Sequence, residues 1–325
     1  MNLHRTAVVF GGAGFIGSAL FRALRDTGEF TQLISADLRA PSAPIEGVRY
    51  EHCDVRQPIT LDGDFGEAEI FNFAAVHATP GHEDWEYFWT NLHGAIEIGR
   101  FADRIGARRL TFTSSITVYG PTDILRDEGG PFTPQSAYGR SKLLAEKIHA
   151  DWQAAGPDRK LIVVRPAPVF GPGENGNFTR LAAALRGGLF AFPGRSDTIK
   201  ACAYVGELVR SMHFARTLDA PTVTYNLAYP DVTTLRDISD AFHRIAGFAK
   251  PRMTVPLWSM MLVGRIFEII AALGLKTPIN RARVAKLVNS THIVPRRLQQ
   301  LGYRFETDLS EGLKRWRDET GGRFT

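Results

Sequence analysis

The chain has 325 residues, of which 44% are hydrophobic and 22% charged, with 31 glycines and 18 prolines. This composition excludes a disordered or collagen-like protein, and the length predicts about two domains, or one large α/β unit with an added lobe. The formal net charge is +5, and the excess of basic residues lies scattered from residue 276 onward, so we do not expect nucleic-acid binding.

The two cysteines, Cys53 and Cys202, are too few for a disulfide framework or a four-thiolate zinc site. The N-terminus also lacks the long apolar region of a signal peptide. We therefore expect a cytoplasmic protein.

Short apolar runs alternate with helical patterns along the first half of the chain. The runs are 7–10, 32–36, 48–50, 70–73, 110–113 and 161–164, each closed by Gly, Asp, Ser or Pro, which is typical of buried strands. The clearest helix carries apolar residues at helical spacing from Phe15 to Leu24 and is expected to stop at Gly28. The alternation predicts an α/β fold, a Rossmann-type doubly wound parallel sheet with helices on both faces.

The pattern changes after residue 164, where a loop rich in Pro and Gly is followed by helices and few strands. We predict a smaller, mostly helical substrate lobe there, although the run from Thr222 to Ala228 again resembles a sheet strand. The expected boundaries are a dinucleotide-binding domain at 1–168, to which the chain returns at about 206–229, and a substrate lobe at 169–205 and 230–325.

One apolar stretch, 255–275, has a membrane-like composition, but Arg265 and Glu268 lie in its middle and Gly264 and Gly274 interrupt it. We expect a buried helix of the smaller lobe and no transmembrane segment. A wall for a lipophilic substrate and a peripheral membrane contact remain open.

A glycine cluster follows the first strand directly and opens the first helix. Gly11, Gly14 and Gly17 form the pattern that lets backbone N–H groups approach a pyrophosphate at a helix N-terminus. Asp37 ends the second strand at the distance where an acid accepts hydrogen bonds from an adenosine ribose. Its charge would repel a 2′-phosphate, so NAD is favoured over NADP, although Arg39 could offset this effect.

Hydroxyl and amine side chains suited to proton transfer lie further along the chain. Tyr138 and Lys142 are four residues apart at the start of a predicted helix, so they share a face, and the ammonium is expected to lower the phenol pKa towards neutrality. Thr113, Ser114 and Ser115 close the fifth strand at the sheet edge where ligands bind. A surface pair and a helix cap are the structural alternatives.

Together these motifs resemble the extended short-chain dehydrogenase/reductases, in particular the NAD-dependent nucleotide-sugar epimerase/dehydratase family. The likeness is strongest in Ser115–Gly120 (Ser-Ile-Thr-Val-Tyr-Gly), in Tyr138-Gly-Arg-Ser-Lys142 and in the loop that starts at Arg165. It implies that Ser115, Tyr138 and Lys142 are catalytic. We expect no metal site, because the loop with His77 and His82 has no second ligand motif to support one.

Binding residues follow from the same motifs and the resemblance. The expected cofactor-binding residues are Gly11, Gly14, Phe15, Ile16, Gly17, Asp37, Asp54, Val55, Phe73, Ala74, Ala75, Asn91, Thr113, Ser114, Tyr138, Lys142 and Pro166. The expected substrate-binding residues are His77, Ser115, Thr117, Tyr138, Asn177 and Lys200. For Asp54, a plain loop aspartate remains an alternative to an adenine contact.

Departures from the family pattern narrow the reaction. Family dehydratases carry Asp-Glu after the catalytic hydroxyl, where this chain has Ile116 and Thr117, and the decarboxylases carry a glutamate at the Thr117 position. Lys200 stands where an arginine usually grips the substrate diphosphate, and Pro168 stands where many relatives have asparagine.

The resemblance implies an NAD-dependent 4-epimerase of a nucleotide-diphosphate sugar, which transfers a hydride transiently to bound NAD through a 4-keto intermediate. It also implies a homodimer formed by the helices that begin near Asn91 and Tyr138. The alternatives are an NAD(P)-dependent reductase of a keto-sugar nucleotide and a hydroxysteroid-dehydrogenase-like enzyme acting on a lipophilic alcohol.

Overall fold

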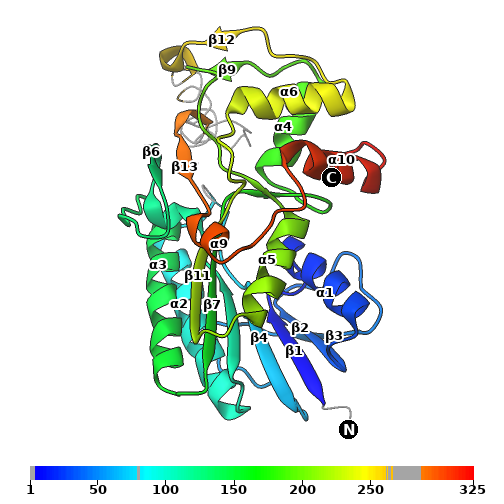
Figure 1. Ribbon diagram of the computed structural model, residues 1–325, viewed down its shortest axis with the longest axis vertical. Coiled ribbons are helices and arrows are strands. Elements are labelled where there is room, and N and C mark those ends of the chain that lie inside the picture. Colours follow the sequence, from blue (N-terminus) through cyan, green and yellow to red (C-terminus); the bar gives the residue numbers. More distant parts are fainter. Residues whose placement is uncertain (1–3, 79–80, 261, 263–264, 266–286) are drawn as a thin grey trace.

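The computed structural model describes residues 4–78, 81–260, 262, 265 and 287–325. A seven-stranded sheet with the order β11-β7-β5-β4-β1-β2-β3 forms its centre, and every neighbouring pair is parallel (Figure 1). The strands are β1 (Arg5–Phe10), β2 (Gln32–Asp37), β3 (Val48–His52), β4 (Glu67–Asn72), β5 (Arg109–Thr113), β7 (Lys160–Pro166) and β11 (Thr222–Leu227). This sheet confirms the predicted doubly wound fold and the seven predicted strands.

The strand order reverses between β1 and β4. From β1 the chain builds outward through β2 to β3, and from β4 it builds the other way through β5 and β7 to β11. In such sheets a crevice opens at the carboxyl ends of the two strands where the order reverses. The turns that follow β1 and β4 are therefore the expected binding position.

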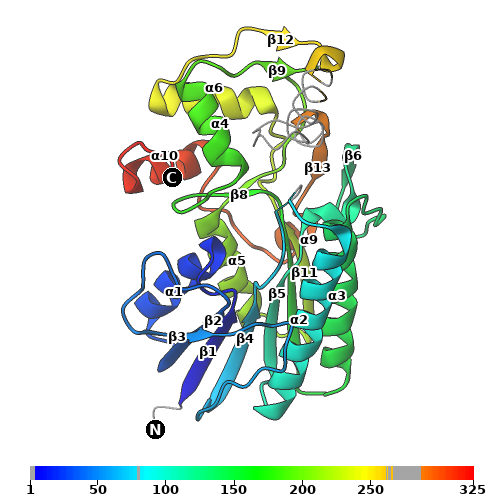
Figure 2. The ribbon, with the colours of Figure 1, turned by 180° about the vertical axis from the view of Figure 1, so that it is seen from behind.

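Helices cover both faces of the sheet (Figures 1 and 2). α2 (Asp84–Arg104) and α3 (Ala137–Ala154) pack side by side on one face, whereas α1 (Phe15–Thr27) and α5 (Val205–Thr217) cover the other. Successive side chains of β1 enter opposite cores, with Val8 and Phe10 under α2 and Ala7 and Val9 under α1. Burial on both faces explains why the strands read as continuous apolar runs.

The first helix ends as its sequence predicts. Gly28 has φ 61°, and its N–H bonds to the carbonyl of Arg25. This left-handed backbone carries no Cβ penalty in glycine, which is why the helix stops there.

The smaller lobe lies beyond the carboxyl ends of the strands (Figure 1). Its core is aromatic and includes Phe170, Phe242 and Trp316. Its elements, with the short ones that flank the sheet, are η1 (Ile116–Tyr119), β6 (Thr122–Arg126), β8 (Val169–Phe170), α4 (Asn177–Arg186), β9 (Phe192–Pro193), β10 (Ala203–Tyr204), α6 (Leu235–Ala246), β12 (Thr254–Val255), β13 (Thr291–Ile293), α9 (Arg296–Gln300) and α10 (Leu309–Glu319).

A buried carboxylate ties the C-terminal segment to the sheet domain. Glu207 in α5 accepts hydrogen bonds at 2.8 Å from the backbone N–H groups of Glu306 and Thr307 and at 2.6 Å from the Tyr303 hydroxyl. These contacts fix the backbone just before α10, which packs in the aromatic core of the smaller lobe.

Most of the apolar stretch 255–275, which we predict to be a buried helix, lies outside the described residues. Residues 257–260 are helical, but Leu257, Trp258 and Leu262 are exposed, so the described part of the stretch is not buried. Over the described ranges, no helix has both the length and the apolarity needed to cross a bilayer.

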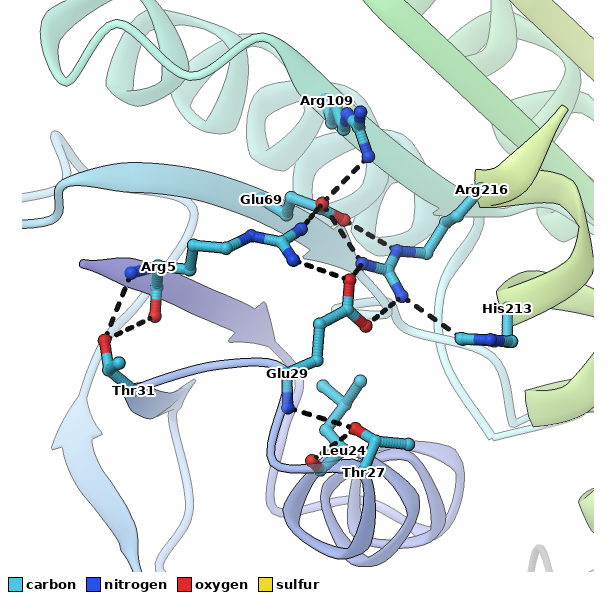
Figure 3. A network of polar contacts seen from close by, with 9 residues as sticks. All are labelled: Arg5, Leu24, Thr27, Glu29, Thr31, Glu69, Arg109, His213 and Arg216. Carbon is cyan, nitrogen blue, oxygen red and sulfur yellow. Dashed lines mark hydrogen bonds and ion pairs between the residues drawn. The ribbon is translucent and has the colours of Figure 1, made fainter. Parts of the chain in front are cut away.

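A network of charged side chains closes the amino-terminal edge of the sheet (Figure 3). The guanidinium of Arg216, at the end of α5, is 2.7 Å from the Glu69 carboxylate in β4 and 2.6 Å from that of Glu29. Arg5 bonds to both carboxylates at 2.9 Å, and Arg109 reaches Glu69 at 3.2 Å. The network joins β1, β4, β5 and α5 at the edge opposite to the smaller lobe.

Candidate functional site

The glycine turn after β1 is built by close backbone contacts. Gly11 has φ 77°, and a Cβ there would lie 2.7 Å from the backbone nitrogen of Ala74. A Cβ on Gly17 would lie 2.6 Å from the Cα of Gly12. The turn therefore requires glycine, and it lies directly against the Phe73–Ala75 segment that follows β4, as the sequence predicts for a cofactor-lining pair of turns.

The N-terminus of α1 follows this turn. Gly14 occupies the N-cap position and offers no side chain to the N–H groups of the first helical turn, which also contains no acidic residue. Phe15 and Ile16, the first two helical residues, pack against the cores of the smaller lobe and of the α5 face, respectively. A helix N-terminus left open in this way can bind an anion such as a pyrophosphate.

Asp37 lies against the glycine turn. One carboxylate oxygen accepts a hydrogen bond from the backbone N–H of Ala13 at 3.1 Å, and the other accepts from the N–H of Arg39 at 2.9 Å. The sequence separates Asp37 and Ala13 by a whole helix, so only the pairing of β1 with β2 brings them together. This position fits the predicted contact with a ribose.

Asp54 and Val55 make local contacts. The Asp54 carboxylate forms an ion pair with Arg56 at 2.7 Å, and hydrogen bonding to that guanidinium holds the pKa of Asp54 below its usual value. Val55 is buried, and its side chain faces α2, where a Cβ on Gly94 would lie 2.9 Å from it. Arg56, which the sequence motifs did not single out, is thus the first partner of the predicted adenine-side acid.

Asn91 fastens the segment after β4 to two helices. Its side-chain oxygen accepts from the Val76 N–H at 2.9 Å, and its amide donates to the Val76 carbonyl and, at 2.9 Å, to the Ser141 hydroxyl. Asn91 therefore orders the segment that includes Ala74 and Ala75. His77, just beyond, is exposed.

The three predicted catalytic residues meet at the carboxyl end of β5. Ser115 is the N-cap of η1, where its hydroxyl accepts from the Thr117 N–H, and it lies close enough to the Tyr138 hydroxyl to lower the pKa of that group. Tyr138 lies in the first turn of α3. A Cβ on Gly139 would lie 2.6 Å from the Thr117 carbonyl oxygen, so the glycine permits the close packing that brings Tyr138 to Ser115.

Lys142 lies one turn further along α3. Its ammonium donates to the Thr113 carbonyl at 2.8 Å and lies 4.7 Å from the centre of the Phe112 ring. It is 6.0 Å from the centre of the Tyr138 ring, which is on the same helical face as the spacing predicts.

The expected lowering of the Tyr138 pKa does not occur in this structure. Burial raises the pKa of Tyr138 to about 12, although the Ser115 side chain opposes this. Burial lowers the pKa of Lys142 to about 7, against the attraction of Glu146. Desolvation outweighs the pairwise attraction assumed from spacing, because both groups leave water and the ammonium bonds to a backbone carbonyl.

A polar network that the sequence motifs did not predict lies behind the site. The Ser114 hydroxyl donates to Glu146, which also receives two hydrogen bonds from Arg165 at 2.9 and 2.7 Å. Arg165 donates to the Tyr119 hydroxyl at 2.8 Å, and that hydroxyl donates to Asn226 at 2.7 Å. One sequence feature could have predicted part of this network: Glu146 follows Lys142 by four residues, so it lies on the same helical face. The Ser114 hydroxyl donates to Glu146 and is therefore part of the network.

The predicted substrate residues come from several segments. The hydroxyl oxygen of Thr117 is buried and has no hydrogen-bond partner among the described residues. Asn177 is the first residue of α4 and accepts a hydrogen bond from Arg180 at 3.2 Å. Pro166 is the last residue of β7, on the sheet side of the loop that enters the smaller lobe.

Lys200 lies in the smaller lobe near β13. Its ammonium donates to the Asn289 carbonyl at 2.6 Å, and burial lowers its pKa to about 8, helped by the nearby charge of Arg195 and opposed by Asp123. The predicted diphosphate-binding lysine therefore already has a backbone partner in this structure.

Comparisons with known proteins agree with this geometry. The model of the NAD dependent epimerase/dehydratase family matches residues 7–228. The chain is 28% identical over 266 residues (81% of the chain, 80% of the relative) to N-acetyl-alpha-D-glucosaminyl-diphospho-ditrans,octacis-undecaprenol 4-epimerase of Escherichia coli O157:H7.

Two solved structures share the fold. The UDP-glucose 4-epimerase of Thermus thermophilus in complex with NAD has a TM-score of 0.75 at 20% identity, covering 98% of this chain and 99% of that one. MoeE5 in complex with UDP-glucuronic acid and NAD has a TM-score of 0.74 at 22% identity, covering 97% and 99%. With the family model matching more than half of its length, this chain is a member of the NAD-dependent epimerase/dehydratase family.

Proposed function

We propose that the protein is an NAD-dependent 4-epimerase whose substrate is a sugar linked to a diphosphate. The observation that carries this proposal is that Ser115, Tyr138 and Lys142 come together at the carboxyl end of β5, where the Ser115 hydroxyl is close enough to Tyr138 to lower its pKa and Lys142 is one helical turn away. The pair lies two strands from the glycine turn, across the point where the strand order reverses. This arrangement can hold a cofactor and move a proton to or from a sugar hydroxyl.

The chain's own residues have distinct roles in this proposal. Tyr138, as the phenolate, takes the proton from the sugar hydroxyl and later returns it, while Ser115 holds the reacting oxygen. Because burial raises the pKa of Tyr138 to about 12 in this structure, this role requires the positive charge of Lys142 and of a bound nicotinamide to lower it. Lys142 places a positive charge beside the phenol. Bound NAD supplies a nicotinamide that accepts and returns two electrons with a hydrogen.

The residues present fit NAD. The glycine turn packs too closely on its own backbone and on Ala74 to admit a Cβ at Gly11 or Gly17, which keeps side chains away from the N-terminus of α1, and the first turn of α1 has no acidic residue. Asp37 beside Ala13 would hold the ribose hydroxyls, and its charge disfavours a 2′-phosphate.

Exchanging Asp37 for Asn is expected to raise the affinity for NADP relative to NAD by about tenfold, because the repulsion of a 2′-phosphate is removed while the side chain keeps its size. Titration of both nucleotides measures the ratio. Asp54→Asn is the matched control, because its carboxylate pairs with Arg56 and its change is expected to leave the ratio as it is. An unaltered ratio in Asp37→Asn would remove this role from Asp37.

Two side chains favour epimerisation over dehydration. Ile116, at the first position where related dehydratases carry acids, is buried in an apolar cluster with Val118, and Thr117 at the second position has no carboxylate. Neither can supply the acid and base that elimination of water needs. The buried, unpartnered Thr117 hydroxyl is suited to bind a sugar hydroxyl instead.

Two groups are candidates for the part of the substrate attached to the other end of the diphosphate. The first is a nucleoside, as in a nucleotide-sugar. A polyprenyl lipid is the second, because the relative that aligns over four-fifths of both chains acts on an undecaprenyl-diphosphate-linked sugar and because exposed apolar side chains lie on the smaller lobe.

Helices α2 and α3 support a homodimer. They present exposed apolar side chains, Trp85, Trp89 and Ile96 on α2 and Leu144 on α3, on the side of the pair that does not pack on the sheet. A second copy would cover them.

The test has two steps. Denaturing the purified protein and identifying the released nucleotide by mass spectrometry should show NAD at near-stoichiometric amounts. Incubation with UDP-N-acetylglucosamine, and separately with a short-chain polyprenyl-diphosphate N-acetylglucosamine, should show the C4 epimer by NMR for at least one of them. No epimer from either substrate, with turnover of a ketone at the expense of added NADPH, would replace the proposal with a reductase.

A further inference from the structure

Exposed apolar side chains gather at one end of the smaller lobe. They come from the loop after α4 and from the segment around β12, which lie at the end of the molecule opposite to the N-terminus (Figures 1 and 2). Trp258 is 72% exposed and Leu189 is 87% exposed. We call these side chains the apolar tip, which consists of Leu189, Met253, Leu257, Trp258 and Leu262.

The tip is one surface because its two segments run side by side. β9 and β12 are paired, with the Phe192 N–H bonded to the Met253 carbonyl at 2.9 Å. Next to Leu189, a Cβ on Gly188 would contact the Ala249 side chain at 3.9 Å. Paired backbone therefore holds the two segments together while these side chains point to solvent.

Cations accompany the tip. Lys250 and Arg252 are exposed, and residues 247–265 contain no Asp or Glu. One carboxylate of the preceding helix α6, Asp240, lies 3.7 Å from the Lys250 ammonium, which is itself half exposed. Exposed Trp and Leu side by side with Lys and Arg are typical of surfaces that enter the boundary between lipid headgroups and acyl chains.

We propose that the apolar tip docks on an anionic lipid bilayer, which would bring the substrate lobe to a lipid-linked sugar diphosphate. This inference rests on the proposed function and specifies the second substituent of its substrate. Trp258 and Leu262 enter the interface, and Lys250 and Arg252 contact lipid phosphates. Lys250 favours a bilayer over a protein partner, because lysine is depleted in protein interfaces, whereas anionic lipid headgroups attract both Lys250 and Arg252.

Co-sedimentation of the full-length protein with vesicles tests the docking directly. Vesicles of phosphatidylglycerol and phosphatidylethanolamine should bind the protein, whereas vesicles of phosphatidylcholine alone should bind it at least about tenfold more weakly. About 1 M salt, which shortens the screening length to about 3 Å, should release most of the charge-dependent binding.

Variants assign the binding to the tip. Trp258→Ser with Leu262→Ser, and separately Lys250→Glu with Arg252→Glu, should each lower vesicle binding by at least about tenfold. Ile124→Ser is the matched control, because Ile124 is 76% exposed in β6, outside the tip, and its change should leave binding unaltered. All variants should keep wild-type NAD content.

The two proposals fail separately. A protein that epimerises a sugar diphosphate but binds no vesicle, or whose tip variants bind like the wild type, overturns the docking and leaves the proposed function. Tip-dependent vesicle binding without any epimer overturns the proposed function and leaves the docking surface.

Discussion

Tyr138→Phe is expected to lower kcat for C4 epimerisation by about 100- to 10,000-fold while NAD stays bound. The hydroxyl is the group that faces Ser115, and phenylalanine keeps the ring that packs near Tyr87 and Lys142. Proton transfer is thus lost without loss of volume. Epimer formation by NMR and the nucleotide released on denaturation are the two measurements.

Tyr87→Phe is the matched control for this variant. Its ring centre is 6.2 Å from that of Tyr138, and its hydroxyl donates to the Ala78 carbonyl at 2.5 Å, outside the catalytic group. We expect less than a tenfold change in kcat. Wild-type turnover in Tyr138→Phe would remove the phenol from the mechanism, and loss of NAD together with turnover would assign Tyr138 a structural role instead.

Arg216→Met is expected to destabilise the protein by about 3 kcal/mol, the lower end of the range for breaking a buried ion pair. Arg216 is buried between Glu69 and Glu29, and methionine leaves both carboxylates with fewer partners (Figure 3). Glu69 keeps Arg5 and Arg109, which is why the larger loss of an isolated buried charge is not expected. Denaturant unfolding measures the difference.

Arg25→Met serves as the control, because the pair of Arg25 with Asp26 is exposed and such pairs contribute at most about 1 kcal/mol. A midpoint for Arg216→Met equal to that of Arg25→Met would show that the buried network contributes no more than a surface pair.

The effect of Arg216→Met should depend on pH. Burial alone would raise the pKa of Glu29, but hydrogen bonding and attraction to Arg216, with Arg5, hold it below its ordinary value. A carboxylate with a lowered pKa stabilises the folded state above its unfolded pKa, and this contribution is lost as the pH falls through the folded pKa. The difference between wild type and variant should therefore be full near neutral pH and shrink below about pH 4.

Short-range sequence patterns predicted the strands and the helix end, because these depend on interactions between residues that are close in the chain. Apolar runs closed by Gly or Asp predicted the strands, and Gly28 predicted the end of α1, because side-chain period and the left-handed cap depend on neighbouring residues alone. The glycine turn was predictable for the same reason. Its tight packing against Ala74 explains why the pattern requires glycine.

Contacts between distant residues were not predictable in this way. The spacing of Tyr138 and Lys142 predicted a shared face but not the direction of their pKa shifts, which burial among α3, β5 and η1 decides. The pairing of Glu146 with Arg165 and the ion network around Arg216 join segments far apart in the chain, and no short-range pattern specifies which charges meet.

The sequence by itself determined the fold class, the glycine turn and the side chains that we propose as catalytic, because each of these depends on residue type at short spacing. Only the tertiary structure decided which hydroxyls and charges share a buried space, how Asp37 reaches Ala13, and that the described apolar residues near Trp258 face solvent. The solvation of a group and the choice of its partner are properties of the folded structure, since they depend on every segment that packs around that group.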